Sequence, residues 1–120
     1  MSPKEAKVFV IEDDKLYQDE IRQVLEEAGH TVVLTSGELF DAVGKIRGGE
    51  VDKLGVQVVT IDGKLTNAGG EGQLLATEMR KRKPKIKTVG LSNSVYGVDG
   101  VNVNVLKINM DGMGEIIDSL

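Results

Sequence analysis

Four apolar segments of the sequence each lead directly into residues that can do polar chemistry. The segments 7–11, 56–61, 86–91 and 101–106 are followed respectively by Glu12-Asp13-Asp14, Asp62, Ser92 and Lys107. Carboxylates held close together repel one another and need a cation, and oxygen ligands of this kind suit Mg²⁺. With charge neutralised in this way, Asp62 can act as a nucleophile toward a phosphoryl group and form an acyl phosphate. Lys107 would supply a point charge, and Ser92 a hydroxyl donor, for the phosphoryl oxygens.

These residues meet only if the apolar segments are neighbouring parallel strands. Apolar residues at helical spacing predict helices over 16–28, from an N-cap at Ser36 to Gly48-Gly49, from 74 to Pro84 and over 113–120, with a further strand over 31–35. In the second of these helices we expect Leu39, Phe40, Val43 and Ile46 to share the buried face. Alternating strands and helices predict an α/β fold, a parallel sheet with helices on both faces.

The composition of the strands predicts their order in the sheet. Segments 7–11 and 56–61 are nearly continuous apolar runs, as expected of strands covered on both faces, whereas 101–106 alternates Val with Asn, as expected at an edge. A doubly wound, flavodoxin-like, five-stranded sheet in the order 2-1-3-4-5 satisfies both patterns. Only about nine residues, including Gly97 and Gly100, separate the last two strands, fewer than the dozen or so that a helical crossover needs. We therefore expect the fourth helix to be short or absent.

Length and composition exclude several classes of protein. The 120 residues fit one domain spanning 1–120, and without Cys there is no disulfide, no thiolate zinc site and no Cys nucleophile. Six of the 15 basic residues lie in 80–87, leaving 9 basic against 19 acidic residues elsewhere, which argues against nucleic-acid binding. We interpret the basic run as a helix C-terminus and an exposed loop; the alternative is a local patch for an anionic partner. A polar N-terminus and the lack of a long apolar run predict a cytoplasmic protein with no membrane contact.

The whole chain resembles a response-regulator receiver domain of two-component signalling. The resemblance is carried by Val8–Ile11 before Glu12-Asp13, by Val58–Ile61 before Asp62, and by Leu91-Ser92 and Leu106-Lys107. Receiver domains are themselves a standard example of the 2-1-3-4-5 strand order. The resemblance implies that Asp62 accepts a phosphoryl group from a sensor histidine kinase, a phosphotransfer protein or a small phosphodonor. Mg²⁺ would be held by Asp13, Asp62 and the backbone carbonyl of Lys64, with Glu12 acting through water. Ser92 and Lys107 would hold the phosphoryl group. Such a protein is a signalling module that at most phosphorylates and dephosphorylates itself, and its downstream target is not visible in the sequence.

Several positions depart from the pattern of that family. Gly70 agrees with the pattern, because the family usually has a Gly in this loop. Thr66 and Ile108 stand at positions where the family usually has Pro. Asn104 replaces the aromatic residue of the family's switch, and Asn93 replaces a small residue. The predicted phosphorylation site is thus kept while the usual readout is altered. The Lys64 side chain either reaches the acidic pocket, where its ammonium would compete with Mg²⁺, or points to solvent. In the first case Lys64→Ala would bind Mg²⁺ more tightly.

Two other functions remain open at this point. The first is a receiver-like protein-binding module that works without phosphorylation and uses the remodelled fourth-helix region. The second is a haloacid-dehalogenase-like phosphatase, because Asp62-Gly63-Lys64-Leu65-Thr66 follows that family's pattern of strand, Asp and Thr. In the second case Lys64 stands in place of the Asp that serves that family as general acid.

Overall fold

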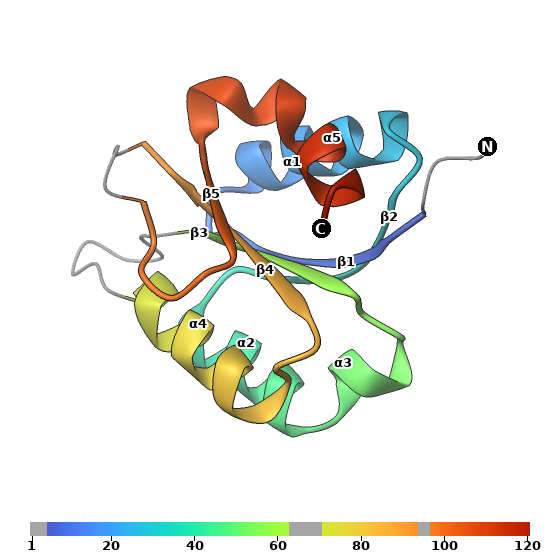
Figure 1. The fold of residues 1–120 in the computed structure, drawn as a ribbon. Helices are drawn as coiled ribbons and strands as arrows, with labels where there is room; N and C mark the ends of the chain where they lie inside the picture. Colours follow the sequence, from blue (N-terminus) through green and yellow to red (C-terminus); the bar gives the residue numbers. More distant parts are fainter. Residues whose placement is uncertain (1–4, 63–70, 94–96) are drawn as a thin grey trace.

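The computed structural model describes residues 5–62, 71–93 and 97–120, which form a central sheet with helices on both faces (Figure 1). The strands are β1 (Lys7–Ile11), β2 (Thr31–Ser36), β3 (Val58–Asp62), β4 (Lys87–Ser92) and β5 (Val103–Leu106). The helices are α1 (Lys15–Glu27), α2 (Leu39–Arg47), α3 (Glu50–Lys53), α4 (Glu71–Arg82), the 3₁₀ helix η1 (Lys107–Gly112) and α5 (Met113–Asp118). Within the described ranges no helix is long and apolar enough to cross a membrane.

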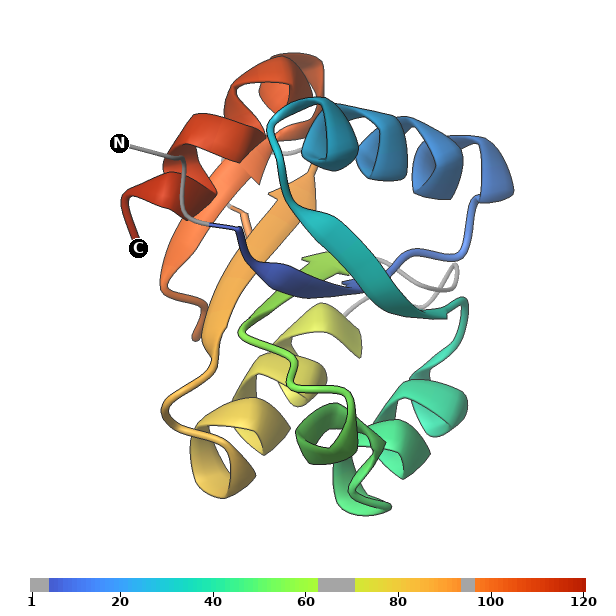
Figure 2. The same cartoon turned by 90° about the vertical axis from the view of Figure 1, so that its right-hand side faces the viewer.

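All neighbouring strands pair in parallel, in the order β2-β1-β3-β4-β5, so the predicted fold is confirmed. Successive side chains of β1 enter opposite layers: Val8 and Val10 pack with α1 and α5, whereas Phe9 and Ile11 pack with α2 and α4. Figure 2 shows these two helical layers on either side of the twisted sheet. Strand β3 is buried along its whole length, as predicted for a strand covered on both faces.

Two predictions for the start of α2 are wrong. Ser36 is the last residue of β2, and its hydroxyl donates to Asp41 Oδ2 at 2.6 Å instead of capping the helix. The N-cap is Glu38, whose side chain accepts from the backbone N–H of Asp41 at 2.9 Å. The buried face of α2 then runs through Ala42 and Ile46, and Phe40, on the opposite side, is 82% exposed. The physical reason is geometric, because residues two apart on a helix point in nearly opposite directions.

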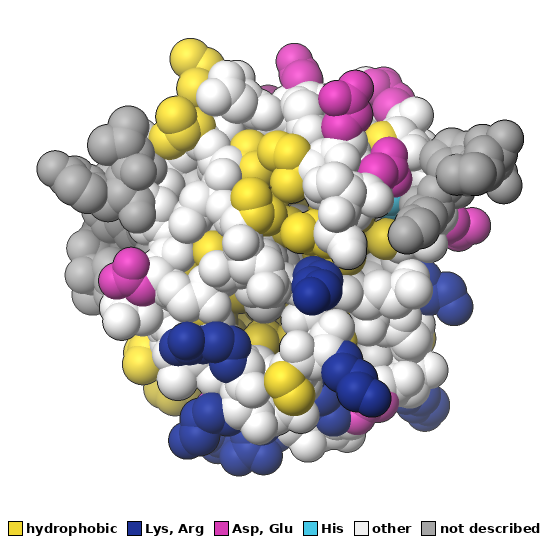
Figure 3. Space-filling view, viewed as in Figure 1, with side chains coloured by type: hydrophobic (Ala, Val, Ile, Leu, Met, Phe, Trp, Pro, Cys, Tyr) yellow, Lys and Arg dark blue, Asp and Glu magenta, His cyan; other side chains and the backbone are white. Residues whose placement is uncertain are grey.

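On the face of the molecule seen in Figure 3, charged residues of opposite sign gather over different helices. Lys and Arg gather over α3 and α4, and Asp and Glu gather over α1 and α5 (Figure 3). The basic run 80–87 begins as the last turn of α4, as we interpreted it, with Arg80, Lys81 and Arg82 beside the helix's carbonyl end. Part of this positive charge is neutralised by ion pairs within the molecule, because Arg82 pairs with Glu78 and Lys83 pairs with Asp52.

The connection from β4 to β5 contains no helix among its described residues, 93 and 97–102, which agrees with the prediction. In its place the side chain of Asn104 joins the connection to the sheet. Its Oδ1 accepts from the backbone N–H of Val98 at 2.7 Å, and its Nδ2 donates to the carbonyl of Val98 at 3.2 Å. Gly90 and Gly97 leave the space for this amide, since a Cβ at either position would overlap the Asn104 side chain.

Candidate functional site

The carboxyl ends of the strands bring the predicted polar residues to one edge of the sheet. Glu12 follows β1, Asp62 and Ser92 are the last residues of β3 and β4, and Lys107 follows β5. The pairing register places Ile11 beside Ile61, Asp62 beside Leu91, and Ser92 beside Leu106. Parallel pairing therefore aligns these strand ends even though Glu12 and Lys107 are 95 residues apart in the chain. Lys64 lies outside the described residues.

The ammonium of Lys107 bridges the two buried carboxylates. Its Nζ lies 3.0 Å from Oε1 of Glu12 and 3.5 Å from Oδ1 of Asp62. Glu12 is 0% and Asp62 4% exposed, and the side chain of Lys107 is 9% exposed. The second carboxylate oxygen of Glu12 accepts from the backbone N–H of Asp13 at 3.0 Å. Since a buried charge is tolerated only when it is paired and hydrogen-bonded, these contacts hold the site together.

The electrostatics of this site favour a proton on Glu12. Burial, together with a hydrogen bond to Asp62 and the charge of that carboxylate, raises the pKa of Glu12 to about 8, although Lys107 works in the opposite direction. Burial alone would lower the pKa of Lys107, but the hydrogen bond to Glu12 and the charges of Asp62 and Glu12 outweigh burial and raise it. Near neutral pH one proton and one ammonium thus balance the carboxyl groups of Glu12 and Asp62.

Three carboxylates form a group that fits a hard divalent cation. Oxygens of Glu12, Asp13 and Asp62 all lie within 4.8 Å of one another. Asp13 is exposed, whereas the other two carboxylates are buried, so the group opens to solvent on the side of Asp13. An oxygen-only set of this kind is what Mg²⁺ prefers in proteins. The ammonium of Lys107 already pairs with two of these carboxylates, so a cation would have to share them with it.

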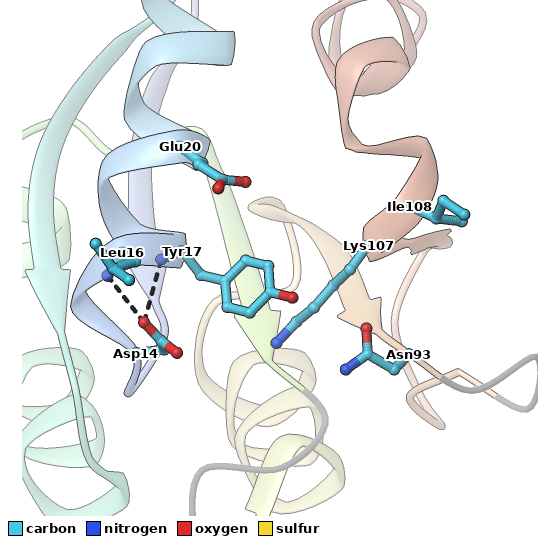
Figure 4. Close-up of a pocket in the computed structure, with 7 residues that line it drawn as sticks. All are labelled: Asp14, Leu16, Tyr17, Glu20, Asn93, Lys107 and Ile108. Atoms are coloured by element: carbon cyan, nitrogen blue, oxygen red, sulfur yellow. Dashed lines mark hydrogen bonds between the residues drawn. The ribbon is translucent and has the colours of Figure 1, made fainter.

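A pocket of about 520 Å³ adjoins the acidic group (Figure 4). Its lining residues come from the start of α1, from the end of β4 and from the start of η1; they are Asp14, Leu16, Tyr17, Glu20, Asn93, Lys107 and Ile108. Asp14 caps α1, since its Oδ1 accepts from the backbone N–H groups of Leu16 at 2.9 Å and of Tyr17 at 3.4 Å. The Lys107 Nζ lies 4.3 Å from the centre of the Tyr17 ring.

Tyr17 is the site residue that the sequence analysis missed. In the sequence, the spacing of Tyr17 from Ile21 and Leu25 predicts only a place on the apolar face of the helix, and Tyr17 does pack partly against that core. The spacing contains no signal for its second contact, because the approach of Lys107 to its ring depends on how η1 packs against α1.

No protein-family model matches the sequence, and neither does any curated protein. Solved structures do match. Response regulator TrrA of Thermotoga maritima, in complex with Mg²⁺-BeF, is 22% identical with a TM-score of 0.78, over 95% of this chain and 97% of that one. The phosphorylated cyanobacterial phytochrome response regulator RcpA is 23% identical with a TM-score of 0.69, over 97% and 91%. A CheY-like receiver domain protein of Methanospirillum hungatei is 20% identical with a TM-score of 0.72, over 97% and 93%. The chain has the fold of response-regulator receiver domains, as its resemblance predicted.

Proposed function

We propose that this chain, as one domain over 1–120, is a receiver in two-component signalling that accepts a phosphoryl group on Asp62 in a Mg²⁺-dependent reaction. The observation that carries the proposal is the surroundings of Asp62. Its buried carboxylate lies 3.5 Å from the ammonium of Lys107 and within 4.8 Å of oxygens of Glu12 and Asp13. A nucleophilic carboxylate, a fixed cation and two further metal-binding carboxylates are what phosphoryl transfer to an aspartate requires.

The residues of the site divide the chemistry among them. An oxygen of Asp62 forms the new bond to phosphorus while the bond from phosphorus to the donor's nitrogen or oxygen breaks. Lys107 then pairs with a phosphoryl oxygen, and the hydroxyl of Ser92, at the end of the neighbouring strand, donates to another. Asp13, Asp62 and the backbone carbonyl of Lys64 would hold Mg²⁺, with Glu12 acting through water, and the bound cation would neutralise charge on the phosphoryl group. By this proposal the chain catalyses no reaction other than its own phosphorylation and dephosphorylation.

The pairing of Lys107 supports the proposed requirement for a divalent cation. The ammonium is held by Glu12 and Asp62. A phosphoryl group that draws on this ammonium leaves the carboxylates with less positive charge, and their mutual repulsion rises. A divalent cation held by the same carboxylates would offset this repulsion. A sensor histidine kinase or a phosphotransfer protein would be the donor in a cytoplasmic setting.

A protein-binding module that works without phosphorylation is the second candidate. The observation that favours it is the amide of Asn104, which joins the β4–β5 connection to the sheet through both of its polar atoms. A connection held in this way presents one fixed surface whether or not Asp62 is modified.

One experiment separates the two functions. The protein is incubated with acetyl phosphate and Mg²⁺ and examined by intact mass spectrometry, and in parallel its amide NMR spectrum is recorded with beryllofluoride and Mg²⁺. A receiver gains one phosphoryl group, which is lost in Asp62→Asn and kept in Asp19→Asn, a control at an exposed carboxylate of α1. The absence of both an adduct and beryllofluoride-induced shifts would instead favour the binding module.

A further inference from the structure

The ammonium of Lys107 has a different neighbour on each of three sides. Two are the carboxylates of Glu12, at 3.0 Å, and Asp62, at 3.5 Å. The third is the face of the Tyr17 ring, whose centre lies 4.3 Å from Nζ. The negative face of an aromatic ring attracts a cation at this distance, most strongly where water is excluded.

The start of α1 fixes the position from which the Tyr17 side chain extends. Tyr17 lies in the first turn of α1, which Asp14 caps, and the side chain of Gln18 donates to the carbonyl of Glu12 at 2.5 Å. These contacts fix the first turn of the helix to the end of β1. Tyr17 also packs against the core beneath α1, and the face of its ring lies beside Lys107.

Lys107 has a different carboxylate available farther out in the same pocket. Glu20, one turn along α1 from Tyr17, lines the pocket and is exposed to solvent (Figure 4). A lysine stem has several rotatable bonds, and its ammonium is better hydrated near Glu20 than when buried between Glu12 and Asp62. The contacts of the inward position, which are the pairs with Glu12 and Asp62 and the face of the Tyr17 ring, must together outweigh this better hydration.

We propose that Tyr17 is a positioning residue that keeps the ammonium of Lys107 directed into the acidic pocket. Its ring attracts the ammonium and excludes water from the side of Lys107 that faces α1. The inference deepens the proposed function, on which its effect on phosphoryl transfer rests, but the position of Lys107 in the unphosphorylated protein is independent of it. Since cation–π contacts change equilibria by about 2- to 30-fold, losing the ring should slow phosphorylation of Asp62 by a factor within this range.

The first test concerns Lys107 in the metal-free protein. Exchange of its ammonium protons with water is measured by NMR in the wild type, Tyr17→Phe, Tyr17→Leu and Phe40→Leu. The last variant is a control that also replaces an aromatic residue with Leu, at an exposed position of α2. We expect faster exchange in Tyr17→Leu alone, because Phe keeps the ring face. Wild-type exchange in Tyr17→Leu would overturn the inference, whether or not Asp62 can be phosphorylated.

The second test separates the electrostatics of the ring from its size. Phenylalanines with increasing numbers of ring fluorines are placed at position 17, which keeps the shape but weakens the negative face of the ring. We expect ammonium exchange to become progressively faster, and acetyl phosphate to modify Asp62 progressively more slowly. Exchange that does not respond to fluorination would overturn the inference by showing that the ring acts through bulk alone. If no variant, including the wild type, is phosphorylated, the proposed function fails while the exchange series still decides the role of Tyr17.

Discussion

Lys107 Nζ lies 3.0 Å from the carboxylate of Glu12 and 3.5 Å from that of Asp62, so one ammonium serves both buried acids of this site. A single cation cannot neutralise two carboxylates, and the pKa of Glu12 is accordingly raised to about 8 by burial and by Asp62. The site therefore favours the binding of additional positive charge. A proton on Glu12 supplies this charge near neutral pH, and a divalent cation would supply it during phosphoryl transfer.

The first prediction concerns the pH dependence of stability. The pKa of Glu12 is about 8 in the folded protein against an ordinary 4.5, so the folded state binds more protons than the unfolded state between these values. The contribution of Glu12 to the free energy of unfolding therefore falls as pH rises from about 4.5 to about 8. We expect Glu12→Gln to remove this decline in urea unfolding measured with a chelator present. Glu26→Gln, at an exposed position of α1, should keep it; a wild-type pH profile in Glu12→Gln would contradict the assignment.

The second prediction concerns the lifetime of phosphorylated Asp62. Asn93 follows β4 and lines the pocket with Lys107, so its side chain stands near the path of water toward an acyl phosphate. Because hydrolysis needs an in-line approach of water, a smaller residue should open this path. We expect Asn93→Ala to lose its phosphoryl group several-fold faster, with the decay followed by intact mass spectrometry. Asn109→Ala, at an exposed position of η1, provides the control. A rate in Asn93→Ala equal to or below that of the wild type would refute the role of Asn93.

The third prediction concerns the β4–β5 connection. Asn104→Ala removes both hydrogen bonds to Val98, each worth about 0.5–1.5 kcal/mol, and should lower the free energy of unfolding by about 1–2 kcal/mol. Asn104→Asp keeps an acceptor for the N–H of Val98 and should lose less. Equal stability of all three proteins in urea unfolding would show that the amide does not hold the connection.

The fourth prediction concerns the contact between α2 and α4. Glu78 on α4 accepts from Arg47 of α2 at 2.6 Å and from Arg82 at 2.5 Å, and these guanidinium groups lower the pKa of Glu78 to about 2. A lowered pKa stabilises the fold above the ordinary value of 4.5, and this contribution is lost as pH falls toward 2. We therefore expect Glu78→Gln to be less stable than the wild type at pH 7, with the difference shrinking in acid.

Thermal unfolding across this pH range, compared with Glu115→Gln on α5, checks the role of Glu78. A difference between Glu78→Gln and the wild type that stays constant down to the lowest pH would mean that the ion pairs are not its source. High salt should reduce the difference at pH 7, because Arg47 and Arg82 are about half exposed and their pairs are screened.

Predictions made from strand ends hold well in this protein, and those made from helix faces hold less well. Asp62 and Ser92 end β3 and β4, and Glu12 and Lys107 follow β1 and β5, because apolar strands of a parallel sheet end where their polar residues begin. Phe40 illustrates the weaker case. It lies two residues before the buried Ala42 and therefore nearly opposite the buried face of α2, because each residue turns the helix by about 100°.

The sequence by itself determined the α/β alternation, the strand order and the set of polar residues at one edge of the sheet, since hydrophobic patterning and parallel pairing are sufficient for these. Only the tertiary structure decided that Lys107 pairs with Glu12 and Asp62 and lies against Tyr17, and that Asn104 bonds Val98. These contacts depend on distances of a few ångströms between segments far apart in the chain. Such distances are set by the packing of α1 and η1 on the sheet, which no local pattern encodes.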